Sequence, residues 1–231
     1  MIDYEQLLET KYTAFKLKHP CILDIGAHTG RHTLPFIRLL DTQFPLETIS
    51  KKNVYAFEPL PHIRQTLQTN IAKQQSKVTC TVLPYALSNQ NGETAFLHAL
   101  EAPEESGLKA RHFYNIETRL LEVTVERKKL DDLELPPIGL IKMDVEGAEL
   151  WVLQGASETI KRDRPIVCFE CGAGSYLGYH DSPESMFDFF TDLGYRIESV
   201  TGIAMCSSQQ FREATHEQEF WDYIALPDTS Q

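Results

Sequence analysis

The sequence predicts an α/β fold built on a mostly parallel sheet. Short apolar runs alternate with amphipathic stretches, the pattern of strands joined by crossover helices. Carboxylates stand where two of these runs end, at Glu58 and Asp144, and ligands of such sheets bind outside the carboxyl ends of the strands. No repeat, low-complexity tract or linker divides the 231 residues, so we expect one domain over residues 1–231.

The elements follow in chain order. Residues 1–19 are charged and amphipathic and predict a surface helix that buries Leu7, Leu8 and Phe15. Residues 20–171 form the predicted ligand-binding core. Its strands are predicted at Cys21–Ile25, Asn53–Glu58, Val78–Leu83, Ile138–Asp144 and Ile166–Cys171. The following helices are predicted near Thr29–Leu40, Pro61–Gln74, Gly147–Ile160 and Pro183–Leu193.

An insertion at residues 92–127 separates the third and fourth core strands. It contains two further predicted strands, Gly92–Leu100 and Leu120–Arg127, which form an extra β-hairpin. The loop Glu101–Arg119 joins them, and loops of this length are often functional lids.

Residues 172–231 are expected to supply loops on the substrate side and an edge hairpin. The two late strands are predicted at Gly194–Val200 and Phe220–Leu226, with a long loop, Thr201–Glu219, between them.

Composition restricts the function. The 33 acidic and 22 basic residues give a net charge of −11, which opposes nucleic-acid binding because phosphate binders depend on Lys and Arg. No apolar stretch approaches the length of a membrane span. Five cysteines without a secretory signal favour a cytoplasmic protein with free thiols. Cys168 and Cys171 are three apart on a predicted strand and face opposite ways, which disfavours a redox or zinc pair.

The first predicted strand runs directly into a glycine loop. Gly26 allows a tight turn, and Gly30 allows a ligand or the strand to approach the start of the next helix. The spacing differs from the dinucleotide fingerprint G-x-G-x-x-G. At the end of the second strand, Glu58 is placed to accept hydrogen bonds from ribose hydroxyls. Together they indicate a nucleoside cofactor.

The segment around Asp144 contains the most unusual residues. Strand side chains alternate, so Lys142 and Asp144 share a face. A lysine in an apolar strand is costly unless paired, and Asp24 and Glu170 on neighbouring strands are the expected partners. The alternative for Glu149 is that it complements the dipole of the helix it opens.

Five ordered motifs resemble one known family. They are Asp24–Gly30, Ala56–Pro59, Tyr85–Ser88, Leu130–Asp132 and Lys142–Glu149. They are similar to those of the FkbM family of S-adenosylmethionine-dependent methyltransferases, which have the class I Rossmann-like fold. The resemblance runs from about Cys21 to Glu170.

The resemblance implies a seven-stranded sheet whose last hairpin supplies an antiparallel strand. It places the methionine part of the cofactor over the glycine loop, the ribose at Glu58 and the adenine beside a turn at residues 85–87. The implied cofactor residues are Asp24, Gly26, Ala27, His28, Thr29, Gly30, Glu58, Pro59, Tyr85, Ala86, Leu87 and Asp144. Family members of known activity are mostly O-methyltransferases, so we expect a hydroxylated small molecule, such as a sugar or polyketide, as acceptor.

Transfer to an aliphatic hydroxyl calls for a general base, because the protonated hydroxyl is a poor nucleophile. Asp144 is the first candidate and Glu170 the second, with Glu146 third. Lys142 is expected to hold its acidic partner ionised. Further acceptor-side candidates come from the long loops: Arg111, His112 and His180.

Two alternatives stay open. Asp144 and Glu170, with Glu146 and Glu149, are oxygen ligands that suit Mg²⁺. We favour catalysis without a metal, because no pair of these acids has the spacing of a known ligand motif. The second alternative is a non-catalytic module that binds S-adenosylmethionine as a scaffold. The sequence does not fix an oligomeric state.

Overall fold

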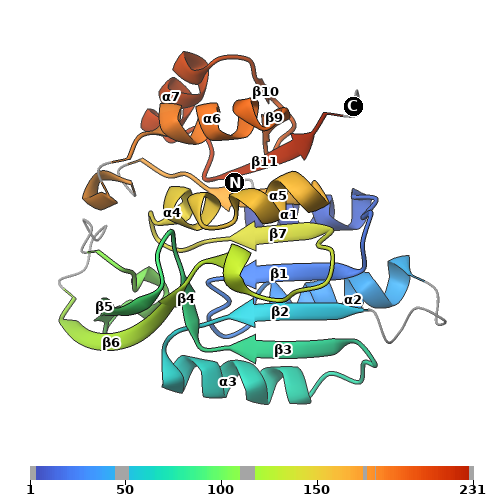
Figure 1. Cartoon of the computed structure of the whole chain (residues 1–231), viewed down its shortest axis with the longest axis vertical. Helices are drawn as coiled ribbons and strands as arrows, with labels where there is room; N and C mark the ends of the chain where they lie inside the picture. The colour runs from blue at the N-terminus through green and yellow to red at the C-terminus, as the bar shows by residue number, and fades with distance from the viewer. Residues whose placement is uncertain (1–3, 45–51, 110–117, 174–175, 180, 229–231) are drawn as a thin grey trace.

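The structure is a computed structural model, and it describes residues 4–44, 52–109, 118–173, 176–179 and 181–228 (Figure 1). The predicted acceptor residues Arg111, His112 and His180 lie outside these ranges. None of the helices in the described ranges has the length and apolar character needed to span a bilayer.

The central layer is an eight-stranded sheet of order β10-β9-β11-β8-β7-β1-β2-β3. The strands are β1 (Cys21–Ile25), β2 (Asn53–Phe57), β3 (Thr79–Leu83), β7 (Leu140–Met143), β8 (Ile166–Glu170), β9 (Tyr195–Ser199), β10 (Ala204–Met205) and β11 (Asp222–Pro227). β3, β2, β1, β7 and β8 pair in parallel, and β11 is antiparallel to both of its neighbours. The predicted mostly parallel sheet with an antiparallel strand is confirmed. The sheet has eight strands rather than the expected seven, because β10 pairs with the predicted edge strand β9.

Helices cover both faces of this sheet (Figure 1). One face packs on α1 (Tyr4–Ala14), α2 (Thr33–Gln43) and α3 (Pro61–Ala72). The other packs on α4 (Glu149–Gln154), α5 (Ser157–Asp163), α6 (Pro183–Asp192) and α7 (Ser208–His216). Strand side chains alternate between the two faces of the sheet. Leu23 and Ile141 therefore enter the core beneath α4 to α7, while Ile22 and Leu140 enter the core beneath α1 and α2.

Some predicted helix boundaries are wrong for local reasons. The single helix expected at Gly147–Ile160 is two helices, because the Asp131 carboxylate accepts the N–H groups of Glu158 and Thr159 at 3.1 and 2.8 Å and caps α5 separately. α2 begins at Thr33 rather than Thr29, because the preceding loop has left-handed backbone.

The segment Thr201–Glu219 is not the expected loop, since it contains β10 and α7. The Ser207 hydroxyl caps α7 by accepting the Gln210 N–H at 3.2 Å.

The insertion and the segment just before it form a second, three-stranded sheet of order β4-β6-β5. Its strands are β4 (Tyr85–Leu87), β5 (Gly92–Ala99) and β6 (Leu120–Lys128). The predicted hairpin is confirmed as β5 and β6, and β4 replaces the turn expected at Tyr85–Leu87 by pairing in parallel with β6. A short 3-10 helix, Pro103–Glu105, follows β5.

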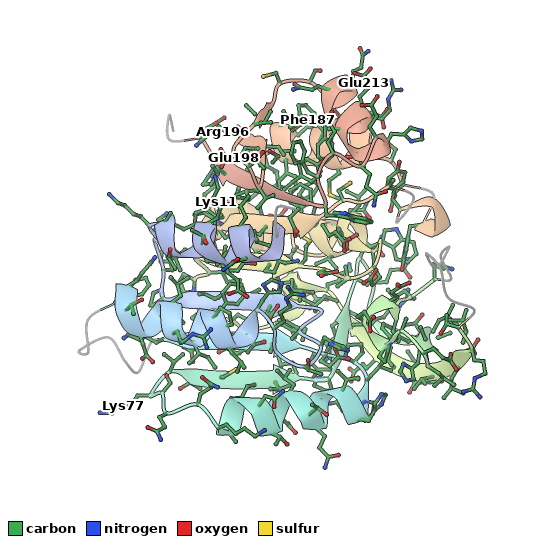
Figure 2. All side chains as sticks on the ribbon, turned by 180° about the vertical axis from the view of Figure 1, so that it is seen from behind. Lys11, Lys77, Phe187, Arg196, Glu198 and Glu213 are labelled. Carbon is green, nitrogen blue, oxygen red and sulfur yellow. The ribbon has the colours of Figure 1, made fainter. Side chains whose placement is uncertain are left out.

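An aromatic cluster joins the sheet to α6 and α7. The buried Phe169 ring stacks 5.0 Å from Phe190 and 5.9 Å from Tyr223, measured between ring centroids. Phe211 meets Tyr223 edge-on at 4.7 Å. Phe187 of α6, labelled in Figure 2, extends the cluster, with its ring 6.2 Å from that of Phe211. This cluster anchors the carboxyl end of β8, which belongs to the site described below.

We predict that Phe169→Ala lowers the free energy of unfolding by about 3–5 kcal/mol, because it empties a fully buried position. Urea denaturation measures the loss. The matched control Ile203→Ala removes a side chain that is 50% exposed and should change stability by less than about 0.5 kcal/mol. Equal losses in the two variants would contradict this view of the core.

Candidate functional site

The candidate site lies where the carboxyl ends of β1, β2, β7 and β8 meet the start of β11. Two pockets open there. The first encloses about 580 Å³ between the glycine loop and the second sheet, and the second about 1320 Å³ beside the ends of β8 and β11, both counted with their solvent-open parts. They share five lining residues and therefore form one continuous groove: Gly26, His28, Glu104, Asp144 and Glu146.

The glycine loop after β1 packs against the ends of the two neighbouring strands, β2 and β7. The N–H groups of Gly26 and Ala27 both donate to the Phe57 carbonyl, at 3.1 and 3.0 Å. Gly26 has φ +81°, and a Cβ there would lie 1.8 Å from the Asp144 carbonyl oxygen. Only glycine fits, and the loop consequently lies against the backbone of Asp144.

Two non-glycine residues with strained backbone line the groove. His28 has φ +45° and Glu146 has φ +60°, and both border both pockets. Such conformations cost on the order of 1–3 kcal/mol and cluster at functional sites. The strain supports a functional role for this groove.

Glu58 ties the glycine loop to the loop after β2. Its carboxylate accepts the His28 N–H at 3.0 Å through Oε2 and the Leu60 N–H at 2.8 Å through Oε1. Burial raises the pKa of Glu58 to about 7, although these two hydrogen bonds act to lower it. Each carboxylate oxygen keeps a second lone pair for a ligand, and Glu58 and Pro59 both line the first pocket.

The rest of the first pocket is largely apolar. Tyr85, Ala86 and Leu87 line it from β4, where sequence analysis expected a turn. Phe96 and Leu108, which sequence analysis missed, line it from the insertion. These residues provide an apolar wall suited to a flat aromatic base.

Lys142 lies beneath the second pocket and is 1% exposed. Its Nζ lies 3.6 Å from Asp144 Oδ2 and 3.7 Å from Asp222 Oδ1. Burial acts to lower the pKa of Lys142, but the charges of Asp144 and Asp222, followed by those of Glu170 and Asp24, raise it above its ordinary value. The ammonium group therefore stays charged.

The partners of Lys142 differ from the expected ones. Asp24 is turned toward α2, where it accepts the Thr33 hydroxyl, and burial raises its pKa to about 6. Asp222 was missed because it begins an antiparallel strand. Such a strand starts at the edge where the parallel strands end, so the predicted hairpin already contained this signal.

Three carboxylates meet beside the lysine. Oxygens of Asp144, Glu149 and Glu170 lie within 4.8 Å of one another. Burial first, and then the charges of Asp144 and Glu146, raise the pKa of Glu170 well above its ordinary value. A hydrogen bond that Glu170 shares with Asp144 acts in the same direction. Burial also raises the pKa of Glu149 to about 7, against the hydrogen bond at 2.9 Å that it accepts from the Val145 N–H.

The same three carboxylates are the set that suits an oxygen-liganded cation such as Mg²⁺. Asp144 already faces the ammonium group of Lys142, and Glu149 already holds the backbone of Val145. The positive charge that faces Asp144 in this structure is thus supplied by the chain itself.

Most of the expected site residues come together in the groove. Gly26, Ala27, His28, Thr29, Glu58, Pro59, Tyr85, Ala86, Leu87, Asp144, Glu146 and Glu170 line one pocket or both. Among the described residues, three of the expected site residues line neither pocket. Lys142 and Asp24 lie beneath the surface, and Gly30 packs toward Leu67 of α3 rather than lining either pocket.

Further lining residues of the second pocket were not found from the sequence: Arg31, His32, Glu104, Glu105, Trp221 and Asp222. Glu104 and Glu105 belong to the insertion, and its position over the groove depends on the pairing of β4 with β6. That pairing left no signal in the local sequence pattern.

Known proteins share both the sequence pattern and the fold. Residues 24–197 match the methyltransferase FkbM domain, which is well over half of the chain. The chain belongs to the FkbM methyltransferase family. This FkbM chain is 30% identical over 141 residues to the hexuronic acid methyltransferase AglP of Haloferax volcanii, covering 60% of this chain and 50% of that protein. It is 28% identical over 168 residues to the methyltransferase sdnD of Sordaria araneosa, covering 61% of each.

The FkbM chain therefore spans about half to three fifths of the length of these curated relatives. Among solved structures, it is similar to the methyltransferase FkbM from Methylobacillus flagellatus KT, with a TM-score of 0.53 at 15% identity, covering 97% of this chain and 55% of that one. At this level of identity the likeness supports the fold, and it confirms the Rossmann-like architecture.

The buried carboxylates predict a specific pH dependence of stability. The pKa of Glu149 is about 7 in the folded chain against an ordinary value of 4.5. Between these values the unfolded chain loses this proton while the folded chain keeps it, so the contribution of Glu149 to stability falls as pH rises. We predict that the unfolding free energy of the wild type minus that of Glu149→Gln decreases by on the order of 3 kcal/mol between pH ~4.5 and ~7.5.

Chemical denaturation across this pH range measures the difference. Taking the difference cancels the histidines, whose lowered pKa values act in the opposite direction. The variant keeps an oxygen acceptor for the Val145 N–H. A difference that is independent of pH would show that Glu149 is ionised in the folded chain.

Proposed function

We propose that this FkbM chain is an S-adenosylmethionine-dependent methyltransferase that methylates a hydroxyl oxygen of a small molecule. The continuous groove is the observation that supports the proposal most. It joins a nucleoside-sized apolar pocket, with a carboxylate placed for ribose, to a larger polar pocket lined by Asp144 and Glu170. Family membership supports methyl transfer, and the two curated relatives are named as methyltransferases.

The chain's residues fit the cofactor. The space that a Cβ at position 26 would fill is closed by the Asp144 carbonyl, so the loop turns sharply and its later residues Ala27, His28 and Thr29 face the second pocket. Those residues would hold the methionine part. Glu58 would accept the ribose hydroxyls, and Tyr85–Leu87 would border the adenine.

The chemistry that S-adenosylmethionine supplies when bound is a methyl group on a positively charged sulfur, which the acceptor oxygen takes as the carbon–sulfur bond breaks and its electron pair stays on sulfur. The chain has to orient the acceptor and remove its hydroxyl proton. Orientation alone contributes much of the rate in such displacements.

Asp144 is the proposed general base, and Glu170 is its hydrogen-bond partner. The ammonium group of Lys142 lies 3.6 Å from Asp144 Oδ2 and favours the carboxylate form of Asp144. The Asp144 carboxylate accepts a hydrogen bond from the acceptor hydroxyl and takes its proton as the new carbon–oxygen bond forms. Glu146, on the strained turn beside it, positions the acceptor from the shared wall of the two pockets.

We predict that Asp144→Asn lowers kcat by about 10²–10⁴-fold, the usual contribution of a general base. Glu170→Gln should lower kcat less, because the amide can still donate a hydrogen bond to Asp144. The assay is transfer of labelled methyl groups from S-adenosylmethionine to a panel of sugars and hydroxylated natural products. The control Glu158→Gln alters a carboxylate on the surface of α5 that pairs with Lys161 and should leave kcat unchanged.

Calorimetry with S-adenosylmethionine and S-adenosylhomocysteine measures whether the chain binds the cofactor, and the transfer assay then separates an enzyme from a non-catalytic module. Unchanged turnover in Asp144→Asn would refute the catalytic assignment. Tight cofactor binding without transfer to any acceptor would favour the scaffold alternative, and no binding of either compound would reject the proposed function.

Binding of ribose hydroxyls at Glu58 should depend on pH. Because its pKa is about 7 and ribose hydroxyls donate to the ionised form, we predict that adenosine binds about tenfold more tightly at pH ~8 than at pH ~6. Adenosine has no group of its own that titrates in this range. In Glu58→Gln the affinity should be weaker and independent of pH. A pH dependence that survives in the variant would place the titrating group elsewhere.

A further inference from the structure

We propose that the indole of Trp221 is the surface on which the acceptor packs, so that the second pocket selects a hydroxylated ring over an open-chain polyol. The inference rests on the proposed function, and it adds the shape of the acceptor. Its basis is the place of Trp221 in the groove and the contact between Trp221 and Gly172.

Trp221 differs from the rest of the pocket lining. It is the one large apolar side chain among the described residues that line the second pocket, since the others are polar, charged, glycine or alanine. Trp221 is half-buried, so it offers apolar surface to a ligand in that pocket. Covering such surface with an apolar ligand face is favourable, because it removes the surface from water.

The chain has a glycine at the point where the indole packs. A Cβ on Gly172 would lie 2.4 Å from Cζ3 and 2.6 Å from Cε3 of Trp221. Gly172 is not among the glycines with positive φ, so its backbone conformation does not call for glycine. The contact with the indole does, because any side chain at position 172 would displace the ring.

Trp221 is also held at a fixed place relative to the proposed base. Its carbonyl accepts the Cys171 N–H at 2.9 Å. The next residue, Asp222, has its Oδ1 3.7 Å from Lys142 Nζ, and the same nitrogen lies 3.6 Å from Asp144 Oδ2. One buried ammonium group therefore links the strand that carries the indole to the carboxylate that accepts the proton.

A pyranose or a cyclitol has the shape that suits this arrangement. Its axial carbon–hydrogen bonds give the ring an apolar face, while its hydroxyls project from the edge. The apolar face packs on the indole, and the hydroxyls at the edge donate to oxygens such as those of Asp144. An open-chain polyol has the same hydroxyls without a fixed apolar face, and it loses more conformational freedom on binding.

The test compares two uncharged probes with equal numbers of carbons and hydroxyls, the ring myo-inositol and the open-chain glucitol. Methyl glucoside serves as a second ring. Each probe is titrated calorimetrically into the wild-type chain saturated with S-adenosylhomocysteine. We expect both rings to bind about tenfold more tightly than glucitol.

Fluorescence tests the contact itself. The chain contains two tryptophans, and Trp151 lines neither pocket. Trp151→Phe therefore leaves Trp221 as the single indole while keeping an aromatic side chain beside Tyr179. In this variant, saturated with S-adenosylhomocysteine, both rings should change the emission of Trp221 with the same dissociation constants as calorimetry gives.

Further variants separate a ligand contact from a structural role. Trp221→Leu should weaken both rings about tenfold and leave glucitol within about twofold, whereas Trp221→Phe should keep most of the ring binding. Gly172→Ala should weaken the rings as Trp221→Leu does, because its methyl group displaces the indole. Thermal unfolding, measured first, reports whether each variant is folded.

The outcomes separate this inference from the proposed function. Equal affinities for rings and glucitol, no binding of either ring, or unchanged ring binding in Trp221→Leu would overturn the inference while cofactor binding remains. Ring binding that leaves the emission of Trp221 unchanged would also overturn it. Failure of the wild type to bind S-adenosylhomocysteine would instead refute the proposed function.

Discussion

A single buried ammonium group organises this site. Lys142 is almost fully buried, yet its Nζ faces two carboxylates, one on the loop after β7 and one at the start of β11. Burying these charges has a large desolvation cost, so the pairs are weak evidence for stability. Their consequence is positional: they hold the start of the antiparallel strand beside the end of β7 and place a positive charge next to Asp144 at the wall of the groove.

The same charge separates the roles of neighbouring acids. Asp144 faces the ammonium group, which favours its carboxylate form, whereas burial and the like charges of its neighbours raise the pKa of Glu170 well above its ordinary value. The two carboxyl groups share a hydrogen bond, so the pair titrates as a unit. The glycine loop lies beside this pair, because Gly26 packs against the backbone of Asp144.

Residues at strand ends could be predicted from the sequence. Glu58, Asp144 and Glu170 end apolar runs, and parallel strands bring such residues to one edge whatever the details of packing. Features that depend on tertiary contacts could not be predicted. The inward turn of Asp24 depends on Thr33, and the separation of α4 from α5 depends on Asp131, in the short 3-10 helix Leu130–Asp132. The position of Glu104 at the groove depends on how the second sheet packs, which no local sequence pattern encodes.

The most direct test of this account is a crystal structure of the chain with S-adenosylhomocysteine. The account predicts ribose hydroxyls within hydrogen-bond distance of the Glu58 carboxylate, adenine against Tyr85–Leu87, and the sulfur facing Asp144 across the wall shared by the two pockets. A nucleoside bound outside this groove, or a ribose that makes no contact with Glu58, would contradict it.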